Sequence, residues 1–163
     1  MAYACVRTDN MSGTTIGKDL VSLKYFDGED KEAAIENGSV VLVGAYLDGQ
    51  REVRKATAVA KDSKLSEVAL IAHEEVDKTK AHNTLKEYIN IAGLNVRGYR
   101  LPSKDCFSLT KEAFAADSVL AKDSVVELAA GTKFKAVASA TEGSTTVGKI
   151  VAVEGEWYVV EVE

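Results

Sequence analysis

The chain has 163 residues, 46% of them hydrophobic, which is enough to bury a core without disulfides or a metal. Its formal net charge is −5 and its basic residues form no stripe that could neutralise phosphates, so nucleic-acid binding is not expected. The longest apolar run, Val40 to Leu47, is too short to span a bilayer, and the N-terminus lacks the basic and apolar segments of a signal peptide. We therefore expect synthesis in the cytoplasm and no membrane partner.

The first twenty residues have little apolar periodicity and are rich in Ser, Thr, Gly and Asn. This composition predicts an extended N-terminal arm over 1–20, followed by a single β-rich domain over 21–163. The arm also carries apolar side chains that a solvated tail does not need, so we predict that it adds a strand to a neighbouring protein. The candidate partner-binding residues are Tyr3, Cys5, Val6, Arg7, Met11 and Ile16.

Two alternatives remain for this arm. Residues 1–7 can be the first strand of the domain's own sheet, or the whole stretch can be a frayed tail. The strand alternative predicts that removal of the arm lowers the stability of the domain by several kcal/mol, because a paired strand and its buried side chains are lost.

The next segment contains a strong hairpin signal. Asp48-Gly49 separates two β-prone runs and predicts strands over 39–47 and 50–58. Residues 65–72 fit a strand or a short helix, and their β-branched centre and short length favour a strand. The polar stretch from 73 to 83 predicts a loop.

One short helix is predicted at 85–92. Thr84 and Glu87 fit a capping box, in which each side chain bonds the backbone of the other. Apolar residues then fall on one face, and Gly93 supplies the left-handed residue that often ends a helix. A helix of only two turns depends on packing for its stability.

The remainder of the chain alternates short apolar runs with turns, which is typical of a small β-barrel or sandwich. Strands are predicted over 96–101, 107–109, 125–128, 134–138, 149–153 and 156–162, with one helical turn over 111–116. The predicted fold class is therefore mainly β, a small barrel or sandwich with one short helix and an extended N-terminal arm.

The sequence contains no catalytic signature, so we expect no enzyme activity, no cofactor and no metal. The two histidines, His73 and His82, lack the spacing of a zinc-protease motif and fit solvated loop positions better than a metal pair. Cys5 and Cys106 have no CxxC partner, and Cys106 resembles a small buried hydrophobe more than a nucleophile.

Two other groups of side chains have a functional and a structural interpretation. Carboxylates at Glu29-Asp30 and Glu74-Glu75 do not follow the EF-hand spacing, so a solvated acidic face is favoured over a calcium site. Trp157 and Tyr158 lie in the predicted terminal hairpin, where one is expected in the core and the other at an interface.

Several turns and strands together resemble a known family. The segments are Met1-Ala2-Tyr3, Met11 to Thr15, Glu36 to Gly44, Gln50 to Arg54 and Gly143 to Ile150. They resemble small structural proteins encoded beside the major capsid gene in tailed phages of Gram-positive bacteria. These are the head decoration, or capsid cement, proteins, and the resemblance covers most of the chain.

The resemblance implies a virion protein that is made in the host cytoplasm, binds the outside of the capsid and stabilises it. Its implied partners are the major capsid protein, contacted through β-sheet interfaces, and further copies of itself as a homo-oligomer on the shell. Competing hypotheses are another phage tail or head-fibre component, or a small β-barrel ligand-binding domain or enzyme. A central pocket lined by polar groups with perturbed pKa values would favour the last of these.

Overall fold

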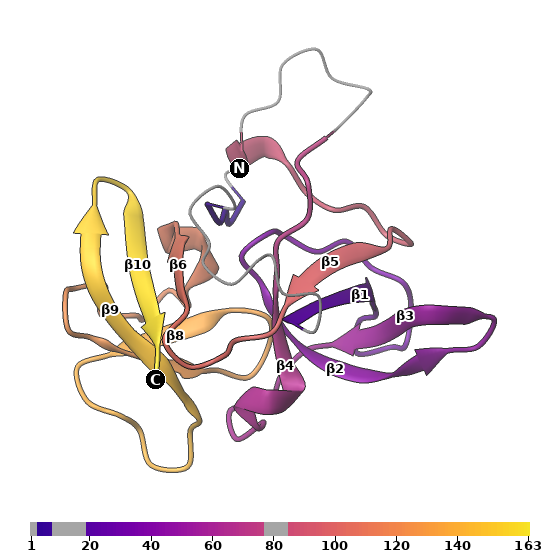
Figure 1. Cartoon of the computed structure of the whole chain (residues 1–163). Coiled ribbons are helices and arrows are strands. Elements are labelled where there is room, and N and C mark those ends of the chain that lie inside the picture. The colour runs from indigo at the N-terminus through magenta and orange to yellow at the C-terminus, as the bar shows by residue number, and fades with distance from the viewer. Residues whose placement is uncertain (1–2, 8–18, 77–84) are drawn as a thin grey trace.

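The computed structural model describes residues 3–7, 19–76 and 85–163. In this part of the chain five strands close into a barrel, five form a second sheet, and there is no α-helix (Figure 1). The prediction of a mainly β fold with a small barrel is therefore confirmed. No helix in the described residues is long and apolar enough to cross a membrane.

The barrel is built from the part of the chain between Leu20 and Tyr99. Its strands are β1 (Leu20–Tyr25), β2 (Val40–Leu47), β3 (Gln50–Thr57), β4 (Val68–Ile71) and β5 (Val96–Tyr99). They follow the order β1-β3-β2-β4-β5, and β5 pairs with β1 to close the barrel. The β1–β3 pair is parallel and the other pairs are antiparallel.

The second sheet is built from the C-terminal part. Its strands are β6 (Cys106–Leu109), β7 (Val125–Leu128), β8 (Phe134–Val137), β9 (Thr146–Glu154) and β10 (Trp157–Val162). The order is β6-β10-β9-β7-β8, antiparallel throughout. The predicted terminal hairpin is confirmed as β9–β10, and the predicted helical turn is the 3-10 turn η5 (Lys111–Ala113).

The barrel has two buried surfaces, one inside it and one facing the second sheet. Strand β4 contributes to both buried surfaces, because all four of its residues are fully buried. Ala69 and Ile71 point into the barrel, whereas Val68 and Leu70 join the core shared with the second sheet. Burial on both faces explains why this strand is a continuous apolar run without the alternation of a half-exposed strand.

Backbone bonds also connect the barrel to the second sheet. Val59 and Gly131 exchange two hydrogen bonds, of 2.8 and 3.0 Å, and the Val40 N–H donates to the Thr132 carbonyl at 2.9 Å. The two sheets are therefore joined by a common core and by their main chains, which gives a rigid base for the segments that project from it.

The predicted helix over 85–92 is wrong. Only Leu85–Glu87 is helical, as the 3-10 turn η4, and the proposed cap Thr84 lies outside the described residues. Asn90 instead forms a β-bridge with Ile35, and its side chain donates to the Ile35 carbonyl at 2.9 Å. A two-turn helix is only marginally stable, so this buried pairing prevails. Gly93 does adopt the expected positive φ, of 80°.

One strand and one strand boundary also differ from the sequence-based expectation. Strand β1 was not predicted, because its main partner, β3, is parallel and distant in sequence, and such pairing leaves no local turn signal. The strand expected over 65–72 begins only at Val68, and the preceding residues form the 3-10 turn η3 (Leu65–Glu67).

Candidate functional site

The predicted partner-binding residues of the N-terminus divide into two sets. Met11 and Ile16 lie outside the described residues, whereas Tyr3 to Arg7 bond to other parts of the same chain: Cys5 to Arg7 lie beside β6, and the Tyr3 N–H donates to the Lys86 carbonyl at 3.0 Å. Val6 forms an antiparallel bridge with Leu109. The Arg7 N–H donates to the Ser108 carbonyl, and the Thr110 N–H donates to the Cys5 carbonyl, both at 3.1 Å. For residues 3–7 the structure thus favours the alternative of a segment in the domain's own sheet.

Burial supports the same assignment. Cys5 and Val6 are each 1% exposed, and Val6 belongs to the core shared by the two sheets. The Cys5 Sγ donates to the Leu85 carbonyl at 2.9 Å, and burial raises the pKa of this thiol to about 11. Arg7 reaches the surface, where its guanidinium lies 5.9 Å from the centre of the Trp157 ring. These side chains can contact a partner only at Arg7 and Tyr3 unless the segment leaves its place.

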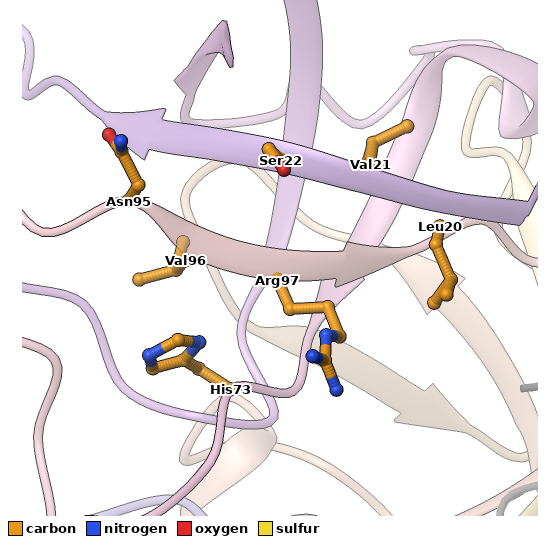
Figure 2. A pocket seen from close by; sticks show the side chains of 7 residues that line it. All are labelled: Leu20, Val21, Ser22, His73, Asn95, Val96 and Arg97. Carbon is orange, nitrogen blue, oxygen red and sulfur yellow. The ribbon is translucent and has the colours of Figure 1, made fainter. Parts of the chain in front are cut away.

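A surface pocket of about 300 Å³ lies beside the barrel, between β1, β5 and the chain that follows β4. Figure 2 shows the His73 ring and the Arg97 guanidinium on the same side of β5. Ser22 is the direct cross-strand partner of Arg97, so the two side chains share a face of the sheet. The lining residues are Leu20, Val21, Ser22, His73, Asn95, Val96 and Arg97.

The position of His73 is fixed by a buried asparagine. The Asn37 amide donates to the His73 carbonyl at 2.9 Å, and its oxygen accepts the His73 N–H at 3.0 Å. Asn37 is held in turn by Asn90, whose amide donates to the Asn37 oxygen at 2.9 Å. This network sets the backbone from which the imidazole enters the pocket.

The imidazole of His73 is neutral at neutral pH for a physical reason. Its Nδ1 is buried and has no hydrogen-bond partner, and burial lowers the pKa of the ring. An unpaired buried N–H is rarer in proteins than an unpaired acceptor, so the proton of the neutral ring belongs on Nε2. Nε2 is then the ring nitrogen that can donate to a ligand.

The third candidate is the hairpin of β2 and β3, which projects from the barrel at the right of Figure 1. Tyr46 near its tip is 57% exposed, and the Arg54 guanidinium lies 4.1 Å from the centre of its ring. The Arg54 Nη1 also donates to the Gly44 carbonyl at 3.2 Å, so Arg54 is held over the ring. Tyr and Arg are the residue types that most often dominate protein interfaces.

The histidine, carboxylate and cysteine side chains singled out in the sequence do not form a metal or catalytic site among the described residues. Among the described residues no group of three or more His, Cys, Asp or Glu side chains is placed to hold a metal, and His82 lies outside them. Glu29 pairs with Lys31 at 2.6 Å, and Asp30 pairs with Lys55. Burial raises the pKa of the Cys106 thiol, which disfavours the reactive thiolate.

The sequence did not indicate the pocket or the exposed pair at the hairpin tip. Ser22, His73 and Arg97 come from three separate elements. The pairing of β1 with β5 sets Ser22 opposite Arg97, and the Ala72 N–H, which donates to the Arg97 carbonyl at 3.0 Å, brings the chain at His73 beside them. No family model matches the chain, and no curated protein or solved structure matches it either.

Proposed function

We propose that the protein is a virion structural protein, a decoration or cement protein that binds the outside of a phage capsid and stabilises it. The resemblance of its sequence to that family supports this proposal. Its partner is the major capsid protein, and many copies occupy equivalent positions on the shell. The protein has no catalytic role in this proposal.

The observation that carries the proposal is the exposed Tyr46–Arg54 pair on the projecting β2–β3 hairpin. An aromatic ring that is already stacked by a guanidinium loses little side-chain freedom on binding. The pair is therefore a pre-organised contact for a protein surface, unlike the concave, mostly apolar site of a small-molecule enzyme.

The same hairpin offers a strand edge for a β-sheet interface. Strand β4 pairs with β2 only over Val40–Leu42, so no other described strand lies against the outer edge of residues 43–47. This stretch is uncharged, and an extended segment of the capsid protein can pair with it. The register of β2 against β3 shifts between Val43 and Tyr46, which bends the edge and limits the pairing to a short segment.

A short contact of this kind is sufficient on a lattice. Individual attachments can be weak, because a shell presents many copies of the same site and neighbouring contacts reinforce one another. The core shared by the barrel and the second sheet keeps the base of each hairpin rigid, so that the tips meet the lattice in a fixed geometry.

The test is cosedimentation of the purified protein with expanded capsid shells that lack it. We expect saturable binding at a fixed ratio of protein to capsid subunit. Tyr46→Ala should weaken binding at least tenfold, the effect of about 1.4 kcal/mol at an interface hot spot. The matched control is Ile91→Ala, which removes another exposed apolar side chain that is not part of the hairpin.

The wild-type protein and the Tyr46→Ala variant together distinguish a wrong function from a wrong contact surface. If the wild-type protein does not bind shells at all, the proposed function is wrong. If it binds and Tyr46→Ala binds equally well, the function stands and the hairpin is not the contact.

A further inference from the structure

The pocket beside the barrel carries a separate inference, which does not depend on capsid binding. Its seven lining residues include one cation, Arg97, and no carboxylate, in a protein whose net charge is −5. Three of its polar side chains are hydrogen-bond donors from three elements, namely the guanidinium, the Ser22 hydroxyl and the His73 ring, whereas the Asn95 amide points away from the last of these in Figure 2. Such a set suits a ligand with a negative charge and several acceptor atoms.

Arg97 already contacts a carboxylate, but loosely. Its Nη2 lies 3.5 Å from Oε1 of Glu74, a side chain outside the lining, whereas a charge-assisted hydrogen bond measures about 2.7–2.9 Å. The Glu74 side chain is 68% exposed, so an ion pair in this position has little stability of its own. A carboxylate that approaches from the pocket can take the guanidinium with better geometry, and Glu74 returns to water at low cost.

His73 supports the same chemistry. Its buried, unpartnered Nδ1 leaves Nε2–H as the ring donor, and Asn37 holds the backbone at this position. Ser22 stands opposite Arg97 across the β1–β5 pair. Leu20 forms an apolar part of the pocket that can contact a short carbon chain, whereas the Val21 side chain packs against the core inside the barrel.

We propose that this pocket binds a carboxylate group, which Arg97 holds with the Ser22 hydroxyl and His73 Nε2–H as further donors. The volume of about 300 Å³ is at the lower limit for ligand sites and fits a small group. The carboxylate has two possible sources, a free small organic acid or the chain terminus or acidic side chain of a bound protein.

The experiment is an NMR titration of the isotope-labelled protein at constant ionic strength. The probes are acetate and glutarate, with acetamide as the neutral control, and a short peptide with a free C-terminus, with its amidated form as control. We expect saturable shifts at Ser22, Val96 and Arg97 with the carboxylates alone. Binding by the peptide but not by the free acids assigns the site to a protein partner, and binding by both assigns it to carboxylates in general.

Two variants complete the test. Arg97→Gln should weaken binding at least about tenfold, since a hydrogen bond to a charged group contributes about 1.5–3 kcal/mol. Arg100→Gln, which changes an arginine three residues away that does not line the pocket, should bind as the wild type does. The proposal is overturned if no probe gives saturable shifts, if acetamide acts like acetate, or if Arg97→Gln binds with unchanged affinity.

Discussion

In the N-terminal segment Tyr3–Arg7 and in the β2–β3 hairpin, the polarity of the sequence and the burial of the side chains disagree in opposite directions. The first lies in a polar stretch of the chain and yet places Cys5 and Val6 in the core. The second begins with the longest apolar run of the chain, Val40 to Leu47, and yet exposes Tyr46. Apolar residues in a polar segment thus indicate that the segment is held, but composition does not say whether its own domain or another protein holds it.

The largest expected effect comes from a charge placed in the N-terminal segment. Val6→Asp should lower the free energy of unfolding by about 3–5 kcal/mol, because an unpaired carboxylate would be buried in the core. Denaturant unfolding measures this loss. The control Val119→Asp, at a side chain 49% exposed, should stay within about 0.5 kcal/mol. Equal stability of Val6→Asp and the wild type would mean that the segment is not part of the fold.

The second effect depends on pH. Burial raises the pKa of Cys5 from 9.0 to about 11, so the folded state keeps a proton that the unfolded state loses first. Stability is therefore fully present below pH 9 and declines as the pH rises towards 11, by about 2–3 kcal/mol in total. Unfolding curves at several pH values measure it. The decline should be smaller by this amount in Cys5→Ala, and an identical pH dependence in the two proteins would contradict the burial of the thiol.

The third effect concerns the hydrogen bonds of Asn90, which lies where the sequence predicted a helix. Asn90 is fully buried and bonds both the Ile35 carbonyl and the Asn37 side chain. Asn90→Leu should cost about 2 kcal/mol, because it removes three buried side-chain hydrogen bonds: those to the Ile35 carbonyl and the Asn37 oxygen, and the one accepted from the Tyr88 hydroxyl. Thermal unfolding would show the loss, whereas Asn95→Leu on the surface should change little. An unchanged midpoint in Asn90→Leu would show that these side-chain bonds do not contribute to stability.

The smallest effect on stability is expected at the hairpin tip. Tyr46→Ala removes an exposed ring and its contact with Arg54, which should change the free energy of unfolding by less than about 1 kcal/mol. Denaturant unfolding provides the measurement. A loss of stability as large as that of Val6→Asp would show that Tyr46 supports the fold. Weaker shell binding by Tyr46→Ala would then reflect unfolding and would not identify a contact.

The sequence predicts those elements whose signals are local. The Asp48-Gly49 turn locates β2 and β3, and the terminal alternation locates β9 and β10. Strand β1 and the pocket depend on pairing between distant segments, which no local pattern encodes. The helix prediction failed because a capping pattern is local, whereas Asn90 pairs with Ile35, which is distant in the sequence.

Amide hydrogen exchange of the native protein tests most directly the claim that residues 3–7 belong to the fold. The Arg7 and Thr110 amides bond across the contact between this segment and β6, and the Val162 amide bonds to the Asp105 carbonyl elsewhere at the second sheet. If the segment is structural, the Arg7 and Thr110 amides should be protected to an extent comparable with the Val162 amide. Exchange of both amides at nearly the rate of an unstructured peptide, with Val162 still protected, would show that the segment leaves its place and would restore it as a candidate for attachment.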